Sequence, residues 1–353
     1  ICHKPPASCT FLCTSPIKEN WAEELTALGA TVTTLEFDGT FEAADDAKFD
    51  GAMITSEAFK LYFQGGMSAL SVPYDALSAL VRSGRVAWVH VCASGLDVPV
   101  FFPLMRACHE TGTTLTHCPG VYGIPIAQYC IGHMLSVCRM IPQHAINQAS
   151  RKYESLVQRD IRTCTVGIVG AGGIGAELAK LSKAFGMGTI GWRRNAAPAP
   201  NYDEMLSGPD GLDRLLSASD FVVVAIPKTP ATEGLIGPAQ LRSMKRTAWV
   251  INVARGKVVD EAALVTALSA EDQAPAGAVL DVFAVEPLPD NSPLWQLPNV
   301  VITPHDSWRT DEALKDNHRY FLDNVGRAAR GQPLQGLVAE EYLAPALAAV
   351  ASL

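Results

Sequence analysis

The sequence predicts an α/β fold with parallel sheets. Of the 353 residues, 48% are hydrophobic and 18% are charged, which is typical of a globular protein with a sizeable core. Short apolar runs alternate with stretches of helical periodicity, and several of the runs have no polar alternation. A strand that helices cover on both faces has this continuous apolar pattern. The length suffices for two domains, each with its own core.

The first third of the chain alternates strands and helices. The expected strands span residues 10–15, 31–37, 51–55 and 86–91. The expected helices span 18–29, where Gly29 is a suitable stop, and 74–84. A longer helix is expected from Pro125 to Ile141, with a buried stripe of Ile126, Cys130, Met134, Val137 and Ile141.

The strand pattern restarts at Thr165. The expected strands lie within residues 165–170, 189–192, 219–227, 247–256, 276–283 and 299–305, and a last helix spans 311–331. Between the two halves, residues 147–162 have no clear period, so a loop and a surface helix both fit. Residues 269–275 are polar and are expected to be a surface insertion.

Composition excludes several classes of protein. The net charge of −8 argues against a nucleic-acid binder, which needs a basic face for phosphate. The chain has no apolar run of about 18 residues, so no membrane span is expected. The nine cysteines are odd in number, have no metal-ligand spacing and all occur at or before Cys164. We therefore expect reduced thiols, no metal site, and a cytoplasmic location or the interior of a reducing organelle. The first residue is not Met, so a processed or truncated form is expected, and the sequence identifies no targeting peptide.

A glycine-rich turn follows the strand at Thr165 and begins a helix. Its pattern is G-x-G-x-x-G, and its residues are Gly170, Gly172, Gly173, Ile174 and Gly175. The first glycine makes the tight turn, the second lets a pyrophosphate approach the backbone, and the third lets helix and strand pack closely. An ordinary βα turn is the alternative. The strand before it and the helix after it favour a dinucleotide-binding turn.

The residues about 20 positions beyond the first glycine indicate which dinucleotide is bound. NAD-binding turns usually have an Asp or Glu there for the ribose hydroxyls. Here the positions are Trp192, Arg193, Arg194 and Asn195. Guanidinium groups suit the 2′-phosphate of NADP(H), which a carboxylate would repel. NADP(H) is therefore the expected cofactor and NAD(H) the second choice, whereas two solvated surface charges are the alternative interpretation.

Three later segments, taken with the glycine turn, resemble the D-isomer-specific 2-hydroxyacid dehydrogenase family. They are VINVARG with Arg255, LDVFAVEP with Asp281 and Glu286, and ITPHDSW with His305. The resemblance covers residues 50–335. It implies two Rossmann-like domains: a substrate domain of residues 1–142 and 306–353, split around a cofactor domain of residues 143–305. It also implies an active site in the cleft between the domains, and a homodimer.

The chemistry of this family fits the three residues that the resemblance makes catalytic. Arg255 would bind the carboxylate and the carbonyl of a 2-keto acid through its planar fork. His305 would be the general acid and base, since imidazole titrates near neutral pH. Glu286, if hydrogen-bonded to that ring, would orient it and favour its protonated form. Taken singly, each could be an ordinary loop or surface residue, but their order along the chain favours a site.

The resemblance implies further binding residues. Ala93, Ser94 and Gly95 would offer backbone N–H groups to the substrate carboxylate, and Trp308 would line the substrate pocket or pack in the core. The remaining cofactor-binding residues would be Pro227, Val253 and Asp281.

The expected activity is NADPH-dependent reduction of a small 2-keto acid, of the glyoxylate or hydroxypyruvate type, to the D-2-hydroxy acid. Two alternatives stay open. One is a nucleotide-sensing binding protein like the family's transcriptional co-repressors. The other is a formate dehydrogenase, which Glu286 disfavours because that enzyme would have Gln in its place.

Overall fold

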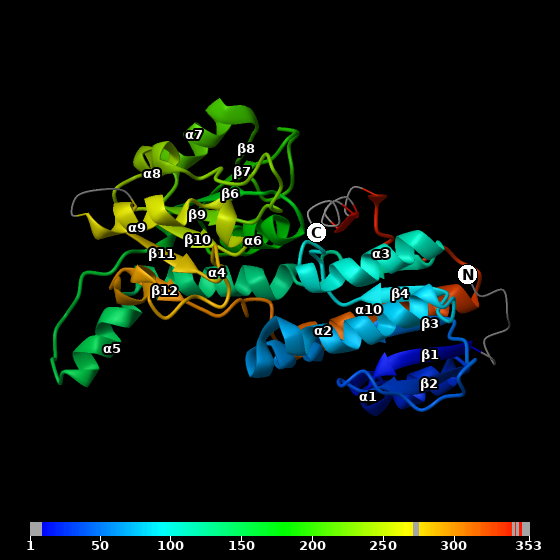
Figure 1. The fold of residues 1–353 in the computed structure, drawn as a ribbon. Helices are drawn as coiled ribbons and strands as arrows, with labels where there is room; N and C mark the ends of the chain where they lie inside the picture. Colours follow the sequence, from blue (N-terminus) through cyan, green and yellow to red (C-terminus); the bar gives the residue numbers. More distant parts are fainter. Residues whose placement is uncertain (1–8, 271–274, 341–342, 344–345, 348–353) are drawn as a thin grey trace. The chain divides into compact units, whose positions relative to one another are not determined.

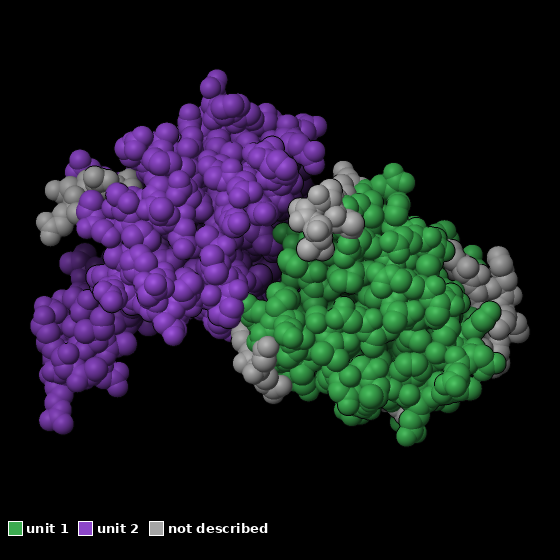
Figure 2. All heavy atoms as spheres, in the orientation of Figure 1, with its two compact units in different colours: residues 1–121, 310–353 green, residues 122–309 purple. Residues whose placement is uncertain are grey.

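The computed structural model describes residues 9–270, 275–340, 343, 346 and 347 (Figure 1). The chain divides into two compact units (Figure 2). Unit 1 comprises Ile1–Val121 together with Thr310–Leu353, and unit 2 comprises Tyr122–Arg309. Part of the expected insertion, residues 271–274, lies outside the described residues.

Unit 1 is built on a parallel five-stranded sheet of order β2-β1-β3-β4-β5. Its strands are β1 (Cys9–Thr14), β2 (Ala30–Leu35), β3 (Gly51–Ile54), β4 (Trp88–Val91) and β5 (Thr114–His117). Its helices are α1 (Ser15–Ala27), α2 (Lys60–Arg82), α3 (Phe102–Thr111) and α10 (Asp311–Ala329), with short 3₁₀ helices η2 (Ser56–Phe59) and η3 (Pro99–Phe101).

Two hydrophobic cores cover the two faces of this sheet. On one face, Leu12 and Val89 pack with Tyr74 of α2 and other residues of α2 and α3. On the other face, Phe11 and Trp88 pack with Phe321 of α10 and with residues of α1. Successive strand residues point to opposite faces, so a strand between two helical layers must be apolar at every position.

Unit 2 contains a parallel seven-stranded sheet of order β12-β11-β10-β9-β6-β7-β8. The strands are β6 (Thr165–Val169), β7 (Gly188–Trp192), β8 (Glu204–Leu206), β9 (Phe221–Val224), β10 (Trp249–Asn252), β11 (Gly277–Leu280) and β12 (Val300–Ile302). The helices are α4 (Gly123–Cys138), α5 (Ile141–Ala149), α6 (Gly173–Ala184), α7 (Gly208–Ala218), α8 (Pro238–Ser243) and α9 (Glu261–Ser269), with 3₁₀ helices η4 (Ile161–Thr163), η5 (Gly256–Val258) and η6 (Pro293–Gln296).

The strand order of unit 2 reverses its direction at β6. From β6 the chain proceeds to β7 and β8 on one side and then to β9–β12 on the other. This is the doubly wound arrangement, in which ligands bind beyond the carboxyl ends of the strands near the point of reversal. The expected α/β class with two parallel, Rossmann-like sheets is confirmed.

The first boundary between the units differs from the expected one. It lies before α4, whereas the sequence analysis assigned residues up to 142 to the first part. Helix α4 groups with unit 2 because it packs closely on α6. A Cβ atom added at Gly123 would be 3.3 Å from the carbonyl oxygen of Gly173. The second boundary falls after Arg309, so His305 and Trp308 both belong to unit 2.

The expected long helix is shorter than predicted. Helix α4 ends at Cys138, Met140 has a positive φ of 52°, and α5 begins at Ile141. The prediction that Ile141 is buried was wrong, since its exposed fraction is 53%. Pro142 at the start of α5 explains the break, because proline fits the first turn of a helix but not its interior. Between α5 and η4 the chain has no regular structure.

The eight cysteines that the structure describes are buried, and none of them is assigned to a disulfide. No helix among the described residues is long and apolar enough to cross a membrane. The described residues also contain no group of three or more His, Cys, Asp or Glu side chains that could bind a metal ion.

Candidate active site

The residues predicted to bind the cofactor follow successive strands of unit 2. Going across the sheet, they follow β7, β6, β9, β10 and β11 at its carboxyl edge. They are Trp192, Arg193 and Arg194 after β7, the glycine turn after β6, Pro227 after β9, Val253 after β10 and Asp281 after β11. Parallel strands end at one edge, so one fold brings these distant segments together.

The glycine turn has the geometry that each glycine was predicted to allow. Gly170 has a φ of 113°, and a Cβ atom there would lie 2.4 Å from the carbonyl oxygen of Ala225. A Cβ atom at Gly175 would lie 2.3 Å from the carbonyl oxygen of Gly170, so α6 packs directly on the turn. Around Gly172 the space is open, and no side chain caps α6. The free N–H groups of this helix start suit a phosphate group.

The two arginines lie beside the glycine turn. The backbone N–H of Gly170 donates to the carbonyl oxygen of Trp192 at 2.9 Å. Arg193 donates through Nε to the carbonyl of Asn195 and through Nη2 to that of Ala197, so part of its guanidinium holds its own loop. Arg194 is exposed. Neither arginine forms an ion pair with a described residue, which leaves Arg194 accessible to an anion.

A close backbone approach positions Arg255. A Cβ atom at Gly256 would lie 1.8 Å from the carbonyl carbon of Phe283, so only glycine fits there. The charge of Arg255 is one of the causes that lower the pKa of Glu286. Arg255 also donates through Nη1 to the carbonyl oxygen of Ala254 at 2.7 Å. The guanidinium is partly exposed.

Glu286 and His305 form a hydrogen-bonded pair. The Nδ1 atom of His305 is 2.8 Å from Oε2 of Glu286, and the other carboxylate oxygen accepts the N–H of Phe283 at 2.9 Å. Burial raises the pKa of Glu286, but the hydrogen bond and the charge of His305 outweigh it, and the net pKa is lowered. Since Glu286 therefore stays ionised, it accepts a proton-bearing Nδ1 of His305. The other ring nitrogen of His305, Nε2, forms no hydrogen bond among the described residues.

The backbone of His305 is strained and held by Asp281. His305 has a φ of 56°, which is unusual for a residue with a side chain. Asp281 is 1% exposed, and its Oδ1 atom accepts from the hydroxyl of Thr303 at 2.6 Å and from the N–H of Asp306 at 3.0 Å. Ser307 donates its N–H to the same carboxylate. These bonds fix the loop that carries His305, a role that the sequence did not reveal.

Trp308 also stabilises this loop. Its Nε1 donates to the carbonyl oxygen of His305 at 3.0 Å, and its ring packs edge-on against Tyr122 with centroids 5.2 Å apart. The phenol of Tyr129 on α4 bonds to Thr303 at 2.7 Å, which ties the loop to the neighbouring helix. Trp308 is partly exposed, so one part of the ring packs and the rest is open.

The predicted substrate loop lies in unit 1, directly after β4. Ala93, Ser94 and Gly95 are each partly exposed. The N–H of Ala93 donates to the carbonyl of Val91 at 2.8 Å, and the carbonyl of Ala93 accepts the N–H of Cys118 at 3.3 Å. The loop is thus anchored to the end of β5, a strand that the sequence analysis did not predict.

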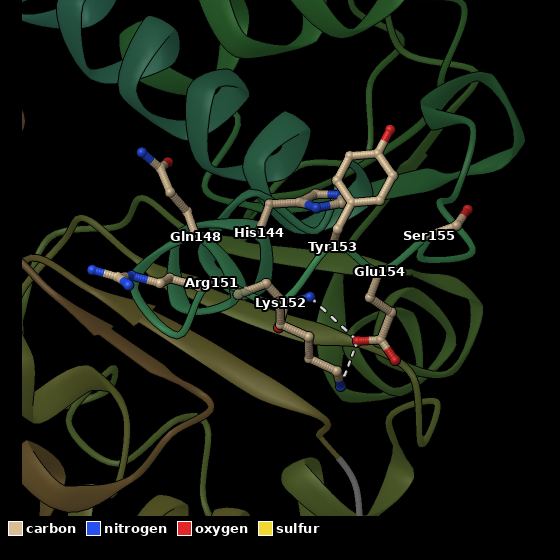
Figure 3. A pocket seen from close by; sticks show the side chains of 8 residues that line it. His144, Gln148, Arg151, Lys152, Tyr153, Glu154 and Ser155 are labelled. Carbon is tan, nitrogen blue, oxygen red and sulfur yellow. Dashed lines mark hydrogen bonds and ion pairs between the residues drawn. The ribbon is translucent and has the colours of Figure 1, made fainter.

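A hollow of about 600 Å³ opens beside α5 and the chain after it, lined by residues between His144 and Ser155 (Figure 3). Lys152 and Glu154 form an ion pair of 2.7 Å in its lining. None of the predicted site residues lines it, so it adds nothing to the candidate active site.

Comparison with known proteins shows the family. Residues 131–307 match the family model described as D-isomer specific 2-hydroxyacid dehydrogenase, NAD binding domain. A glyoxylate reductase of Korarchaeum cryptofilum is 34% identical over 286 residues, with 78% of this chain and 83% of the relative covered. The chain belongs to the D-isomer-specific 2-hydroxyacid dehydrogenase family.

Two further relatives extend the comparison. A D-3-phosphoglycerate dehydrogenase of Archaeoglobus fulgidus is 33% identical over 236 residues, which are 66% of this chain and 44% of the relative. The chain therefore spans less than half the length of that relative. A solved dehydrogenase of this family from Xanthobacter autotrophicus, in complex with NADPH and MES, has 27% identity and a TM-score of 0.72, with 95% of this chain and 99% of that chain covered.

The residues of unit 2 fit a nicotinamide dinucleotide. The family match, residues 131–307, falls entirely within unit 2 and includes the glycine turn, Arg255 and the Glu286–His305 pair. The open space beside the backbone of Gly172 and the uncapped start of α6 suit phosphate groups. Chemically, the arrangement offers a cation for a carboxylate and an imidazole for a proton, both beyond the strand ends.

Proposed function

We propose that this protein reduces small 2-keto acids, of the glyoxylate or hydroxypyruvate type, to D-2-hydroxy acids with NADPH. The observation that carries the proposal is the Glu286–His305 pair of 2.8 Å, whose two residues follow β11 and β12, while Arg255 follows the neighbouring strand β10. The relatives named glyoxylate reductase and glyoxylate/hydroxypyruvate reductase support this substrate class.

The roles of the residues follow from their chemistry. Arg255 binds the carboxylate and carbonyl oxygens of the substrate and withdraws charge from the carbon that is reduced. The bound nicotinamide supplies the hydride. His305 gives the proton on Nε2 to the carbonyl oxygen, while Glu286 holds Nδ1 and stabilises the charged ring before that transfer. Backbone amides of Ala93–Gly95 bind the substrate carboxylate, and Trp308 limits the size of the substrate side chain. Pro227, Val253 and Asp281, which follow β9, β10 and β11, complete the proposed cofactor site.

The preference for NADPH rests on Arg194 and Arg193. The exposed guanidinium of Arg194, which forms no ion pair with a described residue, would bind the adenosine 2′-phosphate.

The first prediction tests the choice of cofactor and the choice of substrate together. Wild type should oxidise NADPH with glyoxylate or hydroxypyruvate and should favour NADPH over NADH in kcat/KM. Arg194→Ala should lower kcat/KM for NADPH about tenfold or more and leave that for NADH nearly unchanged.

The controls separate the parts of this proposal. Arg242→Ala removes an arginine of unit 2 at the end of α8, outside the predicted site, and should change neither value. A wild-type preference for NADH would contradict the proposed 2′-phosphate site but not the proposed reductase activity. Absence of turnover with glyoxylate, hydroxypyruvate, pyruvate and phenylpyruvate, together with tight NADPH binding, would favour a nucleotide-sensing binding protein instead.

We further propose a homodimer that forms through α5 and the chain after it. Four large apolar side chains in this region of unit 2 are exposed: Ile141, Ile146, Tyr153 and Val157. Tyr153 and Val157 are almost fully exposed, and exposed apolar groups near one another are typical of an interface. The mass in solution, measured by light scattering, tests this. The eight free buried thiols support a reducing compartment, such as the cytoplasm or the interior of an organelle.

A further inference from the structure

Two thiols of unit 2 meet where α4 ends and β6 begins. Cys138 is the last residue of α4, and Cys164 directly precedes β6. Their sulfur atoms lie 4.0 Å apart, within reach of an S–H···S hydrogen bond. A disulfide has an S–S length of about 2.05 Å, so a bond between them requires the sulfurs to move about 2 Å closer.

The backbone on both sides of this thiol pair is held by hydrogen bonds. The carbonyl of Cys138 accepts the N–H of Arg159 at 2.8 Å, which brings the chain after α5 back to the end of α4. The N–H of Cys164 donates to the carbonyl of Ile161 at 3.0 Å, and its carbonyl accepts the N–H of Gly188 at 3.0 Å. The two sulfurs are thus kept next to each other, and side-chain rotation suffices to bring them together.

The thiol pair lies just beneath the surface. The exposed fractions of Cys138 and Cys164 are 2% and 1%, but the adjacent residues Arg139 and Thr163 are exposed. Local opening at the end of a helix is less costly than opening of a core strand. A small, uncharged oxidant therefore reaches this pair more easily than it reaches a thiol in the middle of a helix or a sheet.

The surroundings of the pair favour one thiolate. The hydrogen bond from Cys138 lowers the pKa of the Cys164 thiol against the effect of burial, and the charge of Arg159 lowers it as well. The same hydrogen bond, together with burial, raises the pKa of Cys138. Arg159 is itself paired with Asp220 at 2.6 Å, and that carboxylate partly opposes its effect on Cys164. Since the thiolate is the nucleophile in thiol oxidation, Cys164 is suited to react first and Cys138 second.

We propose that Cys138 and Cys164 are an oxidation site, at which hydrogen peroxide converts the two thiols into a disulfide. The thiolate of Cys164 attacks one peroxide oxygen, the O–O bond breaks, and the other oxygen leaves as hydroxide, which takes up a proton to form water. The sulfur of Cys138 then attacks the sulfenic sulfur of Cys164, loses its proton and displaces the second oxygen as water. In total, two thiols lose two electrons and two protons, and one peroxide becomes two water molecules.

The disulfide closes the segment between the two cysteines, residues 139–163, into a covalent loop. This loop contains α5, so both ends of the region proposed to form the dimer become fixed to unit 2. Cys164 lies at the amino end of β6, whereas the predicted cofactor-binding residues follow the carboxyl ends of the strands. A cross-link that restricts the unfolded chain stabilises the folded one, so oxidation should stabilise unit 2.

Peptide mapping of wild type after treatment with hydrogen peroxide tests the proposal. Free thiols are alkylated in denaturant, and the protein is digested with trypsin without reduction. Cys138 lies in the tryptic peptide 107–139 and Cys164 in the peptide 163–180. We expect mass spectrometry to find these two peptides joined, with a mass two hydrogen atoms below their sum, and to find them separate after reduction.

Serine variants assign the link, because the peptide 107–139 contains four cysteines. Cys138→Ser and Cys164→Ser should each abolish it. Cys130→Ser is the matched control and should keep it, since Cys130 is buried on the same helix and lies in the same peptide. Oxidised wild type should melt about 5 °C higher than the reduced protein, and neither Cys138→Ser nor Cys164→Ser should show this rise.

Three results would overturn the inference. The first is that the two peptides stay separate in peroxide-treated wild type, and the second is that they remain joined in Cys138→Ser. The third is oxidation of Cys164 to the sulfinic acid without a link, because Cys138 would then not react with it. If a serine variant does not fold, digestion of wild type with chymotrypsin decides, since cleavage after Leu135 separates Cys138 from the other cysteines of its tryptic peptide. An unchanged melting temperature of the linked protein would contradict the stabilisation.

Discussion

Two glutamate–histidine pairs occupy the two units, and they differ in what surrounds the imidazole. In unit 2, His305 lies 2.8 Å from Glu286, and its side chain is 37% exposed. In unit 1, His318 of α10 lies 3.3 Å from Glu57, and its side chain is 2% exposed. The Nδ1 atom of His318 also accepts the indole N–H of Trp21 at 3.1 Å, so both ring nitrogens have a protein partner.

The comparison shows that a carboxylate beside a histidine does not by itself make an acid–base group. His318 accepts the indole N–H of Trp21 at Nδ1 and faces Glu57 with Nε2, so neither ring nitrogen is left for a substrate. His305 uses only Nδ1 within the described residues and keeps Nε2 for a reacting group. The first pair is suited to hold α10 and η2 together, and the second is suited to transfer a proton.

Replacing each histidine by asparagine should give the largest difference between the pairs. His305→Asn should lower kcat about a thousandfold, because the proton donor is lost, with little change in melting temperature. His318→Asn should instead lower the free energy of unfolding by about 1–3 kcal/mol and leave kcat within about twofold. Steady-state kinetics and thermal unfolding of both variants test this. Equal losses of activity in the two variants would contradict the division of roles.

Replacing the glutamates by glutamine should give a smaller effect in the same direction. Glu286→Gln keeps the size of the side chain and removes the charge that stabilises the protonated His305, so kcat should fall roughly 10- to 100-fold. Glu57→Gln should leave kcat near that of wild type. A Glu286→Gln variant with the kcat of wild type would show that this carboxylate does not assist His305.

The smallest effect concerns stability in acid. Burial raises the pKa of Glu57, but the hydrogen bond and the charge of His318 outweigh it, so the folded pKa is lowered from the usual 4.5. The pKa of Glu286 is lowered in the same way by His305. A carboxyl with a lowered folded pKa stabilises the protein above its unfolded pKa, and this contribution is lost as the pH falls through the folded pKa.

The difference in the free energy of unfolding between wild type and either glutamine variant should therefore be full above about pH 5.5 and shrink steadily below pH 4.5. Urea unfolding at a series of pH values measures it. A difference that grows as the pH falls would mean that the carboxyls are protonated in the folded protein.

The sequence predicted the parts of the fold that have a local pattern. Most strands, the glycine turn and the last helix all follow from apolar runs and glycines that lie next to one another in the chain. The strand β8 has only three residues, Glu204–Leu206, all partly buried, and so has no apolar run to detect. The strand β5, with sequence TLTH, is likewise short, and Leu115 is its single apolar residue.

The candidate site was predicted from short sequence motifs. Contacts that involve residues outside these motifs were not predicted. Glu286 and His305 are 19 residues apart, in segments that resemble a known family, and they do form a pair. His318 meets Glu57 across 261 positions, and no local pattern indicates that contact. The hydrogen bond from Cys118 to Ala93 depends on the pairing of β4 with β5, which could not be inferred once β5 itself was missed.

The carboxylate of Asp281 limits how the segment after His305 can be redesigned. It accepts the backbone N–H groups of Asp306 and Ser307, so both positions exclude proline, and the buried Ser307 also requires a small side chain. A library that alters substrate choice can therefore vary the side chains at 306 and 309 as long as position 306 keeps its backbone N–H, whereas Trp308 also holds the loop through its indole N–H. Any evolved variant of this loop must therefore keep the backbone hydrogen bonds to Asp281.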